Sequence, residues 1–113
     1  MWGLSNSGLS VDLGSGAGLP GLVLACSWPE SRWILMDSST RRTAWLASAV
    51  ERLGVSARVR VLCARAEVVG RGELRGSIHH VVARSFGAPA VTAECAAPLL
   101  RIGGSLVVAE PPT

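Results

Sequence analysis

The sequence contains no lysine: all eleven basic residues among its 113 are arginine, set against eight acidic residues. Charged residues make up only 17%, below the roughly 25% usual for soluble domains, whereas 49% of the residues are hydrophobic. So apolar a composition, with a mean hydropathy of +0.38, excludes a disordered chain. The net charge of +3 permits a nucleic-acid partner without demonstrating one.

The chain also lacks a long uninterrupted hydrophobic run. The longest uncharged stretch lies between Asp12 and Glu30, and its glycines and proline are incompatible with an ordinary membrane span. The first ten residues have neither a basic start nor a continuous apolar core, so no signal peptide is expected. We therefore expect a soluble, cytoplasmic protein with one domain over residues 1–113 and no membrane partner.

Cysteine is scarce as well. The three cysteines stand far apart in apolar surroundings, which predicts reduced, buried thiols. They are Cys26, Cys63 and Cys95.

Strand patterns alternate with helical patterns along the chain. Short apolar runs predict strands at 9–13, 32–36, 58–62, 78–83 and 104–109. The third run alternates charged and apolar residues, as an edge strand with one wet face would. Helical patterns follow Pro20, cover 40–53 and, more weakly, 88–97. This alternation predicts an α/β fold, a parallel sheet with helices on both faces.

The clearest helix is predicted over Thr40 to Leu53. Its apolar residues recur at helical spacing and form one stripe. The stripe consists of Trp45, Leu46, Ala49, Val50 and Leu53. Ser38 or Ser39 can cap the start, and Gly54 ends the helix.

A glycine-rich turn follows the first strand, in the stretch Val11–Gly21. A strand that runs into glycines and then a helix brings backbone close to a ligand at the carboxyl edge of the sheet. Three of the glycines satisfy the dinucleotide-binding fingerprint, which alone is weak evidence. They are Gly16, Gly18 and Gly21.

Two acidic residues distinguish between candidate ligands. Asp12, at the end of the first strand, would repel a pyrophosphate but suits the ammonium-bearing methionine half of S-adenosylmethionine. Asp37 follows the second strand, where a carboxylate can accept hydrogen bonds from both ribose hydroxyls. The alternative for Asp37 is a structural role at the start of the next helix.

At this point the sequence resembles the glucose-inhibited division protein B family. The resemblance rests on four motifs in the expected order: Asp12–Gly21, Asp37-Ser38 with Arg41-Arg42, Arg65-Ala66-Glu67, and Arg84-Ser85-Phe86. Members of that family are S-adenosylmethionine-dependent methyltransferases that act on ring nitrogen seven of a guanine in 16S ribosomal RNA. The resemblance implies a Rossmann-like class I methyltransferase core with strand order 3-2-1-4-5.

The resemblance also implies site roles. The methionine part of the cofactor would be bound by Asp12, Gly14, Ser15, Gly16 and Gly18. Asp37 would bind the ribose with Ser38 beside it, and Ala66 and Glu67 would border the adenine. Arg84 would face the catalytic opening and also border the cofactor. As alternatives from the residues alone, Arg65 is a solvated arginine and Glu67 a helix-start carboxylate.

Several positions depart from the family pattern. His79-His80 replaces the usual Phe-Asp, and the fifth strand ends with Glu110-Pro111 where the family has Lys-Gly. The family also carries helices before the first strand and a strand pair after the fifth, for which 113 residues leave no room. We therefore expect a shortened or divergent member, with 16S rRNA or the small ribosomal subunit as partner, and a possible homodimer.

Other chemistries find little support. Consecutive strand residues point to opposite faces, so His79 and His80 cannot easily share a metal ion, and no metal site is expected. No serine has the His and acid partners of a hydrolase. The four tryptophans fit core or interface positions better than base-stacking platforms.

Methyl transfer to a ring nitrogen needs positioning more than a strong base, consistent with the absence of an evident acid–base pair. Arg84 could then orient the base or a phosphate. Three alternatives stay open: a small-molecule methyltransferase on the same fold, a non-catalytic cofactor-binding paralogue or fragment, and a nicotinamide-dependent oxidoreductase. Asp12 argues against the last of these.

Overall fold

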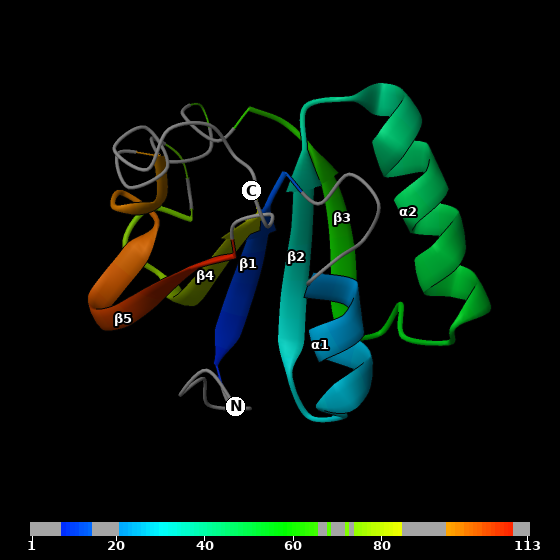
Figure 1. Ribbon diagram of the computed structural model, residues 1–113, viewed down its shortest axis with the longest axis horizontal. Coiled ribbons are helices and arrows are strands. Elements are labelled where there is room, and N and C mark those ends of the chain that lie inside the picture. Colours follow the sequence, from blue (N-terminus) through cyan, green and yellow to red (C-terminus); the bar gives the residue numbers. More distant parts are fainter. Residues whose placement is uncertain are drawn as a thin grey trace.

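The computed structural model describes residues 8–14, 21–65, 68, 72, 74–84 and 95–109. These residues form a five-stranded sheet in which every neighbouring pair of strands is parallel (Figure 1). The strands are β1 (Leu9–Leu13), β2 (Arg32–Asp37), β3 (Val59–Cys63), β4 (Ile78–Arg84) and β5 (Leu100–Ala109). Their order is β3-β2-β1-β4-β5, so the predicted parallel sheet and its strand order are confirmed.

The central strand β1 fixes the alignment of its neighbours. Leu13 lies beside Met36 of β2 and beside Ala83 of β4. The strand order reverses direction between β2 and β4, on either side of β1. Ligands of open α/β sheets bind outside the carboxyl ends of the strands at such a switch point.

Two helices pack on one face of the sheet, α1 (Gly21–Ser27) and α2 (Thr40–Arg52). The buried side chains they share with the strands include Leu22, Leu24, Trp33, Leu35, Leu46, Ala49, Val50 and Val82. Burying one side chain such as Leu46, which has no exposed surface, stabilises the fold by about 1.5–3 kcal/mol. The Ser39 hydroxyl caps α2, and Gly54 follows the helix at φ +71°, as the sequence predicts.

The predicted apolar stripe of α2 is wrong at two positions. Trp45 is 50% exposed and Leu53 is 54% exposed. Thr43 is buried instead, and its hydroxyl donates to the carbonyls of Ser39 at 3.0 Å and Thr40 at 3.1 Å. Because these bonds satisfy the hydroxyl, a threonine can lie on the buried side of the helix. The apolar surface with which α2 packs on the sheet is therefore narrower than the sequence pattern indicated.

The opposite face of the sheet carries a second buried cluster. It contains Val11, Leu13, Ile34, Met36, Ile78, Val81, Ala83, Ala96 and Leu99. Residues 95 and 96 are helical, and Cys95 and Ala96 belong to the layer on this face. Residues 88–94 of the predicted third helix lie outside the described residues.

The last strand begins four residues earlier than predicted. β5 starts at Leu100, which pairs with Ile78 of β4. Two residues further along β4, His80 pairs with Ser105, so β5 contains extra residues between these two pairs. The extra residues on β5 form an irregularity that includes Gly103 at φ +83°. Glycine accepts this conformation without the strain of a side chain, so the chain can pair on both sides of the interruption.

Arg58 joins the end of α1 to the sheet. The sequence placed it in the third strand, but β3 begins at Val59. One guanidinium nitrogen donates to the carbonyl of Ala25 at 2.6 Å and lies 3.3 Å from that of Trp28 and 3.2 Å from that of Ser31. A cation here interacts favourably with the carbonyl of Ala25 in the last turn of the helix and with two carbonyls of the connection to β2.

The prediction of buried thiols is also wrong. The three cysteines are thiols, but Cys26 and Cys63 are exposed and Cys95 is half-buried. Cys26 lies on the outer side of α1, and Cys63 is the last residue of the edge strand β3, so neither reaches the core.

No helix in the described part of the chain is long and apolar enough to cross a membrane.

Candidate functional site

Three strand ends are tied together at the carboxyl edge of the sheet. The backbone N–H of Gly14, just beyond β1, donates to the carbonyl of Met36 on β2 at 2.7 Å. Gly14 has a φ of +70°, which turns the chain out of the strand. The N–H of Ala64, just beyond β3, donates to the carbonyl of Asp37 at 3.0 Å. The residues that follow β1, β2 and β3 therefore meet at one place.

Asp12 lies beneath this edge with no exposed surface. Its Oδ2 accepts a hydrogen bond of 2.7 Å from the backbone N–H of Gly21, the first residue of α1. A Cβ on residue 21 would lie 2.5 Å from that oxygen and 2.6 Å from the Cβ of Asp12, so only glycine fits. The last glycine of the fingerprint thus serves the contact between strand and helix.

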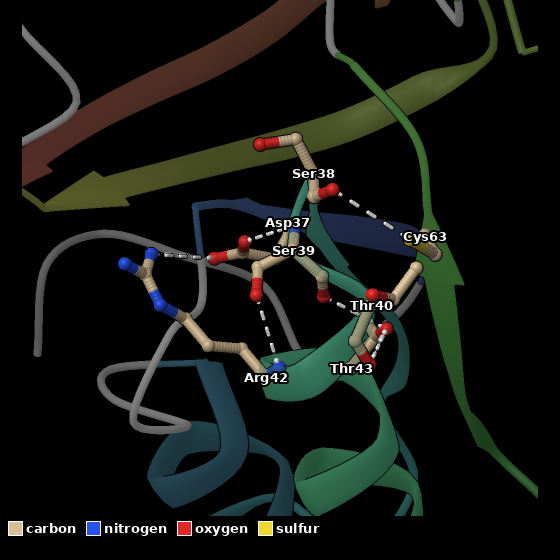
Figure 2. Close-up of polar contacts among 7 residues, drawn as sticks. All are labelled: Asp37, Ser38, Ser39, Thr40, Arg42, Thr43 and Cys63. Atoms are coloured by element: carbon tan, nitrogen blue, oxygen red, sulfur yellow. Dashed lines mark hydrogen bonds and ion pairs between the residues drawn. The ribbon is translucent and has the colours of Figure 1, made fainter.

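Asp37 is the second buried carboxylate, at the end of β2, and is 4% exposed. Its Oδ1 accepts from the backbone N–H of Ser39 at 2.8 Å, and its Oδ2 lies 3.6 Å from a guanidinium nitrogen of Arg42 (Figure 2). The N-cap of α2 is Ser39, whose hydroxyl accepts from the N–H of Arg42 at 3.2 Å. Asp37 therefore supports the turn before the helix without being its cap.

Two residues near Asp37 were missed or left without a role by the sequence analysis. Arg42 was part of a motif only, although its position three residues after the cap places it beside the end of β2. Cys63 was predicted only as a buried thiol, and its Sγ lies 3.8 Å from the carbonyl of Ser38. The pairing of β2 with β3 brings Asp37 opposite Cys63, a relation that no local pattern shows. The Ser38 hydroxyl points away from α2 (Figure 2).

The other predicted site residues stand as follows. Arg84 is the last residue of β4, so its backbone lies at the same edge as Gly14. Outside the described residues lie Ser15, Gly16, Gly18, Ala66 and Glu67. The structure therefore brings together Asp12, Gly14, Asp37, Ser38 and the backbone of Arg84.

The two histidines lie toward the amino end of β4, away from these carboxylates. His80 Nδ1 is 2.7 Å from the hydroxyl of Ser105, and burial, with a smaller effect of the neighbouring His79, lowers the pKa of His80 below its ordinary 6.5. His79 Nε2 contacts the Arg101 guanidinium at 2.8 Å. Within the described residues no three His, Cys, Asp or Glu side chains gather as metal ligands would.

Comparison with known proteins decides the family. The model of the family described as rRNA small subunit methyltransferase G matches residues 3–110. The chain belongs to this family. Ribosomal RNA small subunit methyltransferase G of Syntrophomonas wolfei subsp. wolfei is 42% identical over 98 residues, which cover 87% of this chain. The same match covers 45% of that relative, so the chain spans less than half its length.

Solved structures agree on the fold. A predicted O-methyltransferase from Agrobacterium tumefaciens superposes with a TM-score of 0.82 at 23% identity, covering 96% of this chain and 57% of its own. A coclaurine N-methyltransferase bound to N-methylheliamine and S-adenosylhomocysteine gives 0.77 at 15% identity, covering 93% of this chain and 31% of its own. At such identities the likeness shows the fold alone, a Rossmann-like class I methyltransferase core.

Proposed function

We propose that this chain binds S-adenosylmethionine at the carboxyl edge of β1 and β2 and methylates ring nitrogen seven of a guanine in 16S ribosomal RNA. The observation that carries the proposal is the buried carboxylate of Asp37 at the end of β2, beside the switch point of the sheet, in a chain of the rRNA small subunit methyltransferase G family. A carboxylate at this position can accept hydrogen bonds from both hydroxyls of a ribose.

The residues described at this edge fit the cofactor chemically. Asp37 offers a carboxylate to the ribose, and Asp12, buried near the end of β1, offers a second acid that suits the ammonium and sulfonium charges of the methionine half. Gly14, at positive φ, starts the loop close to β2. The family resemblance completes the proposed set with Ser15, Gly16, Gly18, Ser38, Ala66 and Glu67.

When bound, the cofactor supplies a methyl group on a sulfonium, a centre already activated for in-line displacement. The guanine nitrogen attacks with its own lone pair, so the protein needs to hold the two reactants in line and needs no strong base. In this scheme Arg84, which ends β4 at the same edge, orients the base or a neighbouring phosphate. Hydrogen bonds of its guanidinium to such acceptors would be charge-assisted and directional.

Methyl transfer from labelled S-adenosylmethionine tests the proposal. The acceptors are small ribosomal subunits and free 16S rRNA that lack the modification, with a pool of small metabolites in parallel. We expect label in 16S rRNA, recovered as 7-methylguanine after digestion. Asp37→Ala should lose most of this label, whereas Ser48→Ala, an exposed position on α2, should keep it.

Each other result points to a different function. Label only in the metabolite pool would indicate a small-molecule methyltransferase. Binding of S-adenosylhomocysteine without transfer to any acceptor would indicate a cofactor-binding protein without catalysis. Either result would overturn the proposed rRNA methylation.

A further inference from the structure

Arg42 stands beside the carboxylate that we assign to the ribose. It lies in the first turn of α2, and its guanidinium reaches back to within 3.6 Å of Asp37 Oδ2 (Figure 2). The two partners differ in environment, because the Arg42 side chain is 63% exposed and that of Asp37 only 4%. A distance of 3.6 Å is an ion pair and is longer than a hydrogen bond.

The position of Arg42 is unfavourable for the helix itself. The first turn of α2 contains no acidic residue and carries two arginines, Arg41 and Arg42. The N-terminus of a helix has a partial positive charge, which repels cations and favours acids. Local rules of this kind are often broken at functional sites. The contact with Asp37 gives Arg42 a reason to be there, whereas Arg41 makes no ion pair with Asp37.

The Asp37 carboxylate is held at both oxygens. The N–H of Ser39 binds Oδ1 at 2.8 Å, and the Arg42 guanidinium attracts Oδ2. Holding both oxygens fixes the plane of the carboxylate, and two adjacent hydroxyls of a ligand need a fixed plane to donate to both oxygens together.

We propose that Arg42 is a positioning residue for the ribose diol: together with the N–H of Ser39 it orients Asp37 so that the carboxylate accepts both hydroxyls. The inference rests on the proposed function, because it takes Asp37 as the ribose acceptor. Arg42 acts through Asp37 and not by contact with the reacting atoms.

Calorimetry with two ligands tests this role. The ligands are S-adenosylhomocysteine and its analogue that lacks both ribose hydroxyls. Arg42→Ala should weaken binding of S-adenosylhomocysteine by up to about fivefold, the range of a partly exposed ion pair. It should leave binding of the dideoxy analogue unchanged. Arg42→Lys should fall between the variant and the parent, because lysine keeps the charge but not the fork of donors.

Arg41→Ala is the matched control, since it removes the neighbouring arginine from the same helical turn. It should leave both affinities unchanged. The thermal midpoint of Arg42→Ala should stay close to that of the parent, because the backbone N–H that binds Ser39 remains and removing a cation from the helix N-terminus offsets the lost ion pair. Lower affinity together with nearly unchanged stability separates positioning from a merely structural role.

Three results would contradict the proposal. Equal weakening of both ligands by Arg42→Ala would place Arg42 outside the diol interaction. Unchanged affinity in Arg42→Ala, with clear weakening in Asp37→Ala, would remove Arg42 and leave the proposed function standing. Unchanged affinity in a folded Asp37→Ala would instead overturn the assignment of Asp37 itself. Should Arg42→Ala fail to fold, Arg42→Gln takes its place in the same comparison.

Discussion

The carboxylate of Asp12 accepts a hydrogen bond of 2.7 Å from the backbone N–H of Gly21 and so joins the central strand to the start of α1. Asp12 is fully buried, and its side chain leaves no room for a Cβ on residue 21. Both ends of the glycine-rich loop are therefore fixed: Gly14 is bonded to Met36, and Gly21 is bonded to Asp12. These two bonds place Gly14 and Gly21 against β2 and β1 at the carboxyl edge of the sheet.

Gly21→Ala should reduce both stability and cofactor affinity. The added Cβ would meet Asp12 at 2.5–2.6 Å, so the helix or the acid must shift. Overpacking of this kind costs about 1–3 kcal/mol of the free energy of unfolding. Chemical denaturation measures that loss, and calorimetry with S-adenosylhomocysteine measures the affinity.

Gly54→Ala is the matched control for this prediction. Gly54 has a φ of +71° but nothing within 4 Å of an added Cβ, so alanine there costs about 1–2 kcal/mol of backbone strain alone. It should leave cofactor affinity intact. If the two glycine variants bind S-adenosylhomocysteine equally well, the Asp12–Gly21 contact has no part in cofactor binding.

Cofactor binding should protect Cys63 from alkylation. Cys63 is exposed at the end of β3, and its thiol contacts the carbonyl of Ser38 beside the candidate ribose site. S-adenosylhomocysteine should slow its reaction with iodoacetamide in proportion to occupancy, followed by mass spectrometry of the digested protein. Cys26, exposed on α1, serves as the internal control and should react at an unchanged rate. Equal protection of both thiols, or of neither, would argue against a ligand at this edge.

Much of this arrangement could be predicted from the sequence. Short apolar runs predicted four of the five strands to within one residue at each end, because buried parallel strands have a simple pattern. Asp12 and Asp37 were found because each stands at the end of such a run. The start of β5 was missed, since the irregularity around Gly103 lets a strand continue through residues with no strand pattern.

Side-chain relations between elements could not be predicted in the same way. The exposure of Trp45 depends on how far α2 is rotated over the sheet, which helical periodicity does not give. The Arg42–Asp37 pair depends on the turn at Ser39, and the Arg58 contacts depend on where the end of α1 meets β3. Such contacts join residues whose spacing in the sequence carries no signal.

Stability should fall as the pH drops below about 6.5, in part because of His80. Burial lowers the pKa of folded His80 below its ordinary value of 6.5, so the unfolded chain takes up a proton first. The effect of His80 on the free energy of unfolding is therefore absent at pH above 6.5. It becomes destabilising as the pH falls from 6.5 to the lower pKa of the folded state. His80→Gln, which keeps a partner for Ser105, should flatten this part of the profile.

Denaturant titrations of the parent and His80→Gln at pH 7.5, 6.5 and 5.5 measure the effect. His79→Gln is the matched control, and it should retain most of the fall in stability, because the desolvation of His80 remains and only the smaller effect of His79 is removed. If the parent and His80→Gln lose the same stability between pH 7.5 and 5.5, His80 does not cause this part of the pH dependence.

We expect the protein to self-associate as a homodimer through β5. Within the described part of the chain, β5 pairs on one side only, and Ile102 on it is 97% exposed. Exposed strand edges with apolar side chains pair with other chains. Ile102→Lys should lower the apparent mass at high concentration in light scattering, whereas Trp45→Lys on α2 should not. A parent that stays monomeric at high concentration, or association abolished by Trp45→Lys, would contradict this interface.

Asp37→Ala should weaken binding of S-adenosylhomocysteine, because it removes the proposed acceptor of the ribose hydroxyls. Loss of a charge-assisted hydrogen bond to a hydroxyl should cost about 1.5–3 kcal/mol, or roughly tenfold to a hundredfold in affinity. The buried position of Asp37 makes replacement by water a poor substitute for the lost acceptor.

The most direct test is the thermal unfolding midpoint of the parent chain with S-adenosylhomocysteine and, separately, with NAD. A ligand at a hundred times its Kd stabilises the folded state by about 2.7 kcal/mol. We predict a rise of several degrees with S-adenosylhomocysteine, none with NAD, and loss of the rise in Asp37→Ala. A rise with NAD alone, or an undiminished rise in Asp37→Ala, would contradict a methyltransferase cofactor site built on the carboxylate at the end of β2.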